Sequence, residues 1–297
     1  MSISITNINN NWKLLSTGNK YYEEELFTKF EDAFLYECNG RNNGINIIHH
    51  ARSYVQCIEF STVLRCTGGV TAPYCELADI RFLAYSLKRN TARLLFLQFK
   101  EAKQNTIGYY ADINEKQMLL FSEFPMVSYY GQGPDLHDVL QDTIHNCPQS
   151  GAMFAMIEYD SASKEYNLCF MNHTMLGPQY PRLTRSKSGY HYYDHLLPTS
   201  TTTVPATASS PAFTYCDYVS TFEEFLYRVK RLEVGREIDI ADLFEHISEE
   251  ELPEDLIEYC KNNNNIDNIV TDNVKDYKSG KSVHLVDTLA LNVDELV

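Results

Sequence analysis

The sequence contains no hydrophobic run long enough to cross a membrane as a helix. None of its apolar stretches approaches the roughly twenty residues that a spanning helix needs. The first residues also lack the positively charged stretch followed by an apolar stretch that marks a secretory signal. We therefore expect a cytoplasmic protein.

Cysteine and glycine patterns for several common site types are absent as well. The eight cysteines include no Cys-x-x-Cys pair and no Cys/His cluster with zinc spacing, so we expect reduced thiols rather than structural zinc. The sequence has no Gly-x-Gly-x-x-Gly, no Gly-x-x-x-x-Gly-Lys and no Gly-x-Ser-x-Gly. These absences disfavour nucleotide-hydrolysing motors and serine hydrolases.

Positive charge is scarce overall but is concentrated in one region. The chain has 25 Lys and Arg against 40 Asp and Glu, a net charge of −15, which argues against a free-standing, avid nucleic-acid binder. Basic residues nevertheless gather between positions 81 and 103, while the C-terminal third carries much of the acid. A local basic strip on an acidic body is compatible with DNA binding that requires a partner or an oligomer.

The sequence contains two neighbouring apolar runs, residues 79–85 and 93–100. The polar residues 86–92 between them are typical of a turn, so the pattern predicts a β-hairpin. Alternation along the second strand places Gln98 and Lys100 on one face. If the loop centres on Arg89 and Asn90, Asp79 lies opposite Lys100, and a slip of one residue would move Asp79 to the other face.

Asp79 followed by Gln98-Phe99-Lys100 resembles the metal-binding hairpin of the PD-(D/E)xK nuclease superfamily. Within it, the pattern is similar to the variants, such as Mrr-type restriction enzymes, in which Gln replaces the Glu of the E-x-K element. The resemblance implies a catalytic set of Asp79, Gln98, Lys100 and a further acid. It implies that Asp79, Gln98 and the Phe99 carbonyl hold Mg²⁺ or Mn²⁺, and that Lys100 orients or activates the attacking water.

The further acid has three candidates. Glu76 is the nearest, but its spacing of three from Asp79 would place it on the opposite face of a straight strand, so it needs a bend at the strand entry. Glu31 and Glu59 are the alternatives. The Gln at position 98 removes one negative charge from the metal site, which leaves weak metal binding or a degenerate nuclease open.

Composition and periodicity divide the chain into three parts. Residues 1–195 are expected to form a restriction-endonuclease-like α/β domain, a mixed sheet flanked by helices. It is expected to include helices over 22–38 and 114–124, a strand over 53–64 and a second hairpin over 152–159 and 165–171. Residues 196–215, rich in Pro, Ser and Thr, are expected to be a linker or loop. Residues 216–297 are expected to form a C-terminal helical extension and a weakly folded acidic tail. The first helix of this extension is capped by Thr221, and a later helix is expected over 253–260.

Two further patterns are weaker. His191 and His195 have the helical spacing that a metal site can use, although no third ligand is nearby. Basic and aromatic residues alternate through 182–193, as contacts to a nucleic-acid strand require, and a solvated surface loop is the alternative. The nucleic-acid-binding candidates are Arg81, Lys88, Arg89, Lys103, Arg182, Arg185 and Lys187.

Two hypotheses of different class follow. The first is a magnesium-dependent DNA endonuclease, which the resemblance to restriction-like families implies is the effector of a prokaryotic anti-phage defence system, working with a sensor or ATPase subunit or as a homo-oligomer. The second is a catalytically inactive adaptor or inhibitor that keeps a nuclease-like fold and binds protein partners, or mimics DNA, through its acidic surface. The placement of Asp79, Gln98 and Lys100 discriminates between them.

Overall fold

The architecture is taken from a computed structural model of the chain. It describes residues 2–18, 20–38, 44–48, 57–60, 74–104, 109–114, 117–118, 120–121, 127–129, 151–172, 188–193, 219–243, 247, 252–263 and 287–297. Within these residues the chain forms a mixed α/β structure, which confirms the α/β class that the sequence predicts.

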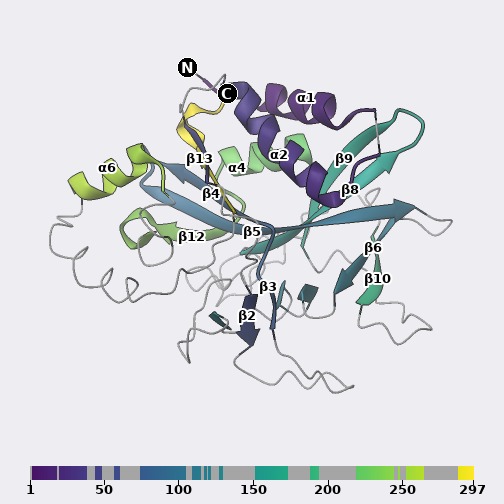
Figure 1. The fold of residues 1–297 in the computed structure, drawn as a ribbon. Helices are drawn as coiled ribbons and strands as arrows, with labels where there is room; N and C mark the ends of the chain where they lie inside the picture. Colours follow the sequence, from purple (N-terminus) through teal and green to yellow (C-terminus); the bar gives the residue numbers. More distant parts are fainter. Residues whose placement is uncertain are drawn as a thin grey trace, which may run out of the picture.

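A large mixed sheet forms the centre of the molecule (Figure 1). Its main path runs β1 (Ile45–Ile48), β13 (Asp287–Asn292), β4 (Ile80–Ser86), β5 (Thr91–Gln104), β8 (Ala152–Asp160), β9 (Glu165–Met171) and β11 (Val219–Thr221). The β13–β4 and β5–β8 pairs are parallel, and the other pairs along this path are antiparallel.

Shorter strands extend both ends of β5. β12 (Arg236–Asp239) pairs with its beginning, β6 (Tyr109–Asn114) pairs with its end, and β10 (Ser188–Tyr193) pairs with β6. A separate three-stranded sheet consists of β3 (Tyr74–Glu76), β2 (Cys57–Phe60) and β7 (Val127–Tyr129). The chain therefore leaves this small sheet at β3 and enters the central sheet at β4, directly around Asp79.

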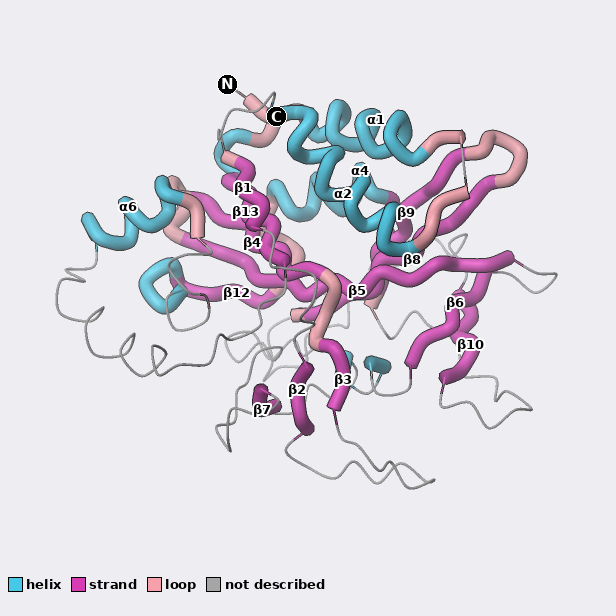
Figure 2. Tube along the Cα trace, viewed as in Figure 1, coloured by secondary structure: helices cyan, strands magenta, loops and turns pink. Residues whose placement is uncertain are grey.

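Three helices cover one face of the central sheet, α1 (Ile5–Ser16), α2 (Glu23–Cys38) and α4 (Phe222–Lys230) (Figure 2). α6 (Glu254–Asn263) and the 3-10 turn η2 (Ile240–Asp242) pack with the other face. Alternation along β5 produces two cores: Leu97 and Phe99 pack with the three helices, while Leu94 and Phe96 pack with the opposite cluster. Gln98 and Lys100 have the parity of Leu94 and Phe96.

Several predicted elements are confirmed. The helix predicted over 22–38 is α2, and the two predicted hairpins are β4–β5 and β8–β9. α4 begins where the capping box indicates, because the Thr221 side chain accepts a hydrogen bond from the Glu224 N–H. The helix predicted over 253–260 is α6.

The prediction of a C-terminal helical extension with a weakly folded tail is wrong for the described residues. β11 and β12 join the central sheet, and β13 lies inside it, paired with β1 on one side and β4 on the other. The two ends of the chain meet, since Ile3 N–H donates to the Glu295 carbonyl at 2.6 Å and η5 (Val293–Glu295) follows β13 (Figure 2). The short run 287–292 carries no signal that tells a buried strand from a tail.

Other predictions meet the structure only in part. His191 lies on β10, so it does not have the helical geometry that its spacing from His195 suggested, and His195 lies outside the described residues. The strand predicted over 53–64 is described only at β2. The expected linker over 196–215 also lies outside the described residues.

Candidate metal site on the central hairpin

The register of the β4–β5 hairpin places Asp79 beside Gln98 rather than opposite Lys100. Ile80 pairs with Leu97 and Ser86 pairs with Thr91, so the turn centres one residue earlier than expected. The predicted partner is therefore wrong by two positions, which preserves the face on which Asp79 lies. The turn lacks an Asn-Gly pair and is closed instead by Asn90 at φ 50°, a conformation that asparagine tolerates.

Asp79 is held at one carboxylate oxygen by two donors from β5. Gln98 Nε2 lies 2.6 Å and the Phe99 backbone N lies 2.5 Å from Asp79 Oδ2. Gln98 is itself 1% exposed, and its Oε1 accepts a hydrogen bond of 3.0 Å from Gln117 Nε2. Because N–H and C=O of one strand residue point to the same edge, the Phe99 carbonyl lies on the Asp79 side of β5.

Burial and neighbouring charge perturb the Asp79 carboxyl. Desolvation raises the pKa of Asp79 from 3.8 to about 7, Lys100 opposes this rise, and Glu76 adds to it. The pKa of Glu76 is raised as well, first by burial, with Lys100 lowering it and Glu23 raising it. The Lys100 ammonium therefore interacts electrostatically with the Asp79 and Glu76 carboxyl groups at this end of the hairpin.

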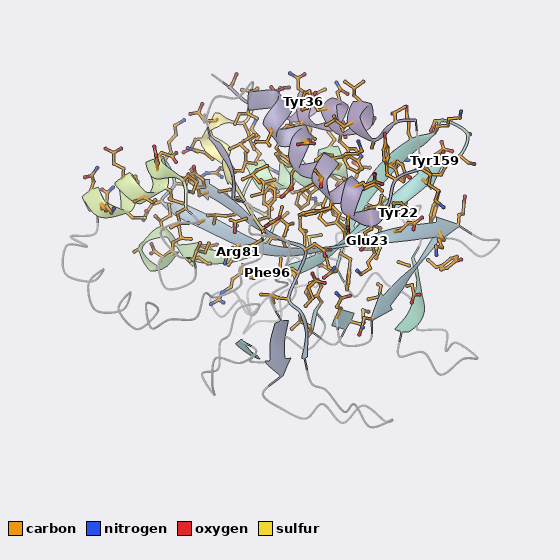
Figure 3. The ribbon with its side chains drawn as sticks, in the orientation of Figure 1. Tyr22, Glu23, Tyr36, Arg81, Phe96 and Tyr159 are labelled. Atoms are coloured by element: carbon orange, nitrogen blue, oxygen red, sulfur yellow. The ribbon has the colours of Figure 1, made fainter. Side chains whose placement is uncertain are left out.

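Lys100 forms an ion pair with the first residue of α2. Its Nζ lies 3.5 Å from Glu23 Oε1, and its side chain is 14% exposed. The other Glu23 oxygen accepts a hydrogen bond of 3.1 Å from the Glu101 backbone N–H, which fixes the start of the helix against β5 (Figure 3). Lys100 is thus held between the acids of the hairpin and the acid of the helix.

The bend that Glu76 requires is present. β3 ends at Glu76 in the small sheet, β4 begins at Ile80 in the central sheet, and the three residues between them are not strand. Of the two candidate acids whose side chains the structure describes, Glu76 and Glu31, Glu76 is the one whose charge acts on Asp79. Glu31 is buried within α2 at 1% exposure, and the side chain of Glu59 in β2 lies outside the described residues.

The donor set fits a hard, hydrated cation better than a soft one. The described residues contain no group of three His, Cys, Asp or Glu side chains placed to hold a metal ion. Mg²⁺ is bound in many sites by only one or two carboxylates and retains several waters. Asp79 and Glu76 supply two such groups; burial raises the pKa of both, the charge of Glu76 adds to the rise at Asp79, and a divalent cation would favour the ionised form of each.

Among the described basic residues proposed for nucleic-acid contact, Arg81, Lys88 and Arg89 do not lie at this site. Arg81 is 6% exposed and its Nη2 donates to Thr288 Oγ1 at 2.9 Å, which makes it part of the packed sheet. Lys88 and Arg89 lie in the turn at the opposite end of the hairpin, where Arg89 Nη2 donates to the Lys230 carbonyl. Burial thus removes Arg81 from the surface, and the length of the hairpin separates Lys88 and Arg89 from the site.

Lys103 is the nucleic-acid candidate that lies exposed near the site, on the same strand as Lys100. Three others, Arg182, Arg185 and Lys187, lie outside the described residues.

Two site residues were not anticipated from the sequence. Glu23 belongs to a predicted helix, but nothing in its spacing shows that the helix begins over Lys100. Gln117 lies in a segment expected to be helical, and its contact with Gln98 depends on how the chain returns after β6. Both contacts depend on tertiary packing, for which a single sequence carries no periodic signal.

Comparisons with known proteins identify no relative. No family model matches the chain, and no curated protein or solved structure matches it. Among the described residues, no helix is both long and apolar enough to cross a membrane.

Proposed function

We propose that the protein is a magnesium-dependent DNA endonuclease whose active site is the Asp79 end of the β4–β5 hairpin. The observation that carries the proposal is the convergence of Asp79, Gln98 and Lys100 on one face of two paired strands, with the Asp79–Gln98 contact at 2.6 Å. Helix, Asp strand and Gln-x-Lys strand also follow one another in the order of the restriction-endonuclease-like core, which supports that fold as part of the proposal.

The residues present divide the work of phosphodiester hydrolysis. Asp79, Glu76 and the Phe99 carbonyl would hold the cation, which when bound polarises the phosphate and lowers the pKa of a bound water. Lys100, next to both acids, orients the attacking water or stabilises the charge that develops on the phosphate. The ion pair with Glu23 keeps the Lys100 ammonium in place until substrate arrives.

The net charge of −15 limits the affinity of such an enzyme for DNA. Phosphate contacts dominate affinity for nucleic acid, so an acidic chain requires a partner or a second copy to retain the substrate. We therefore include in the proposal a role as effector subunit of a prokaryotic anti-phage defence system, with a sensor or ATPase subunit or a homo-oligomer supplying the DNA contact. This part of the proposal is supported by the resemblance to Mrr-type enzymes and by the charge.

A second candidate function is supported by the hydrogen bonding of the same site. Asp79 Oδ2 is already occupied by two donors, and Lys100 is already paired with Glu23. A hairpin whose polar groups are satisfied internally would suit a protein that retains the fold without the reaction. Such a protein would act as an adaptor or inhibitor that binds protein partners through its acidic surface.

A plasmid-cleavage assay with Mg²⁺ or Mn²⁺ separates the two candidates. Wild type is compared with Asp79→Ala and Lys100→Ala, and with Lys13→Ala as a control, because Lys13 is an exposed lysine on α1 that belongs to neither the candidate site nor the candidate nucleic-acid contacts. The endonuclease proposal predicts metal-dependent cleavage that both site variants lose and the control retains. Absence of cleavage by the wild type together with its co-purifying partner, with partner binding unchanged in both site variants, would support the adaptor.

A further inference from the structure

Asp79, Gln98 and Gln117 form a continuous chain of side-chain hydrogen bonds. Gln117 Nε2 donates to Gln98 Oε1 at 3.0 Å, and Gln98 Nε2 donates to Asp79 Oδ2 at 2.6 Å. Gln98 and Gln117 are buried, at 1% and 8% exposure. The three residues come from the loop before β4, from β5 and from the segment after β6, so the chain connects parts of the fold that are distant in sequence.

The Asp79 carboxylate, the acceptor at one end, fixes the donor-to-acceptor direction of this series of hydrogen bonds. When Asp79 is ionised its carboxylate only accepts hydrogen bonds, so the Gln98 group that faces it is the N–H₂ end of the amide, as the Nε2 to Oδ2 contact shows. The Gln98 oxygen must then point away from Asp79, where the N–H₂ end of Gln117 satisfies it. A buried carbonyl oxygen without a donor is costly, so removal of Gln117 would leave the Gln98 amide less firmly held.

We propose that Gln117 is a positioning residue that holds the Gln98 amide so that Gln98 serves as a donor to Asp79 rather than as an oxygen ligand. In this arrangement Gln98 and the Phe99 N–H fix Oδ2 and leave Oδ1 of Asp79 to face the cation. The proposal changes the role that the family resemblance implies for Gln98. Its metal-binding consequence rests on the proposed function, whereas the orientation of the two amides does not.

The orientation is tested first in the absence of metal. Protein labelled with ¹⁵N-glutamine is prepared as wild type, Gln98→Met, Gln117→Met and Met118→Leu, and hydrogen exchange of the glutamine side-chain amides is measured by NMR. Met118 is the matched control because it neighbours Gln117 and packs only at the edge of the same core. The signal that disappears in Gln98→Met identifies Gln98.

We expect the Gln98 amide to exchange roughly five- to tenfold faster in Gln117→Met than in wild type or Met118→Leu, since a hydrogen bond that fixed it is lost. A Gln98 signal with unchanged position and exchange rate in Gln117→Met would overturn the proposal, whatever the protein does with metal.

Mn²⁺ titration of the same proteins then tests the consequence for the site. Gln98→Met and Gln117→Met should each weaken Mn²⁺ binding about tenfold, the typical effect of losing a partner that orients a metal ligand. The double variant should bind no more weakly than Gln98→Met alone, because Gln117 acts through Gln98.

Losses that multiply in the double variant would overturn the positioning role, as would tighter binding by Gln117→Met. A wild-type protein that binds no Mn²⁺ would instead contradict the proposed nuclease function, while the exchange experiment would still decide the role of Gln117.

Discussion

Replacement of Asp79 with asparagine should stabilise the fold at neutral pH, because the wild-type carboxylate is ionised at a cost. The pKa of Asp79 is raised from 3.8 to about 7, chiefly by burial. Between these two values the folded carboxyl holds a proton that the unfolded carboxyl has released. The folded state therefore binds more protons, and the free energy of unfolding of the wild type falls as the pH rises through this window.

The size of the effect follows from the same two values. A difference of about 3 pH units at 1.36 kcal/mol per unit corresponds to about 4 kcal/mol over the whole window, of which about 2–3 kcal/mol falls between pH 5 and pH 8. Asparagine cannot ionise but still offers an oxygen to the Gln98 and Phe99 donors. The free energy of unfolding of Asp79→Asn, relative to wild type, should thus increase by about 2–3 kcal/mol from pH 5 to pH 8.

Urea denaturation of both proteins at several pH values measures this difference. Asp160→Asn is the matched control, because Asp160 is an exposed residue at the end of β8 whose pKa is lowered by hydrogen bonds from Ala162 N–H and the Ser163 hydroxyl. The stability of this variant relative to wild type should stay constant from pH 5 to pH 8, because a carboxyl with a lowered pKa is ionised in both the folded and the unfolded state throughout this range. If Asp79→Asn were destabilised to the same extent at pH 5 and pH 8, the reasoning about the Asp79 environment would be refuted.

Three further predictions concern the fold that supports the site. Deletion of residues 287–297 should prevent folding, seen as loss of cooperative urea unfolding, because β13 is an interior strand; a stable truncated protein would contradict this. Phe225→Ala should lower the free energy of unfolding by about 3–5 kcal/mol, since the buried ring stacks on Phe170 with centroids 4.0 Å apart. Tyr85→Phe should lower the free energy of unfolding by about 1–3 kcal/mol, because it removes a hydrogen bond to the Asp255 carboxylate, while the circular dichroism spectrum stays unchanged.

The parts of the fold that could be predicted are those with a local pattern. Apolar runs separated by short polar segments indicate the strands of both hairpins, and Thr221 with Glu224 indicates the start of α4. The face of Asp79 was predicted correctly because a register error of two positions preserves it. The exact partner was not, because the turn at 87–90 has no residue pair that dictates its centre.

The parts that could not be predicted depend on contacts between distant segments. Residues 287–292 form an inner strand only because β1 and β4 lie on either side of them, and the sequence around them resembles a tail. Glu23 contacts Lys100 and Gln117 contacts Gln98, both from segments that pack against β5. Arg81 is not available to a basic surface strip because its side chain is hydrogen-bonded to Thr288. The type of a residue shows whether its side chain can bind a metal or donate a hydrogen bond. Tertiary packing determines which other residue that side chain contacts.

Calorimetric titration with Mn²⁺ of wild type and Asp79→Asn at pH 8 tests the central claim most directly. At this pH the Asp79 carboxyl is ionised, and asparagine removes its charge while preserving its shape. The account predicts one binding event in the wild type that is absent from Asp79→Asn, together with thermal stabilisation by Mn²⁺ of the wild type alone. Equal binding by both proteins, or no binding by either, would contradict a metal site at the Asp79 end of the hairpin.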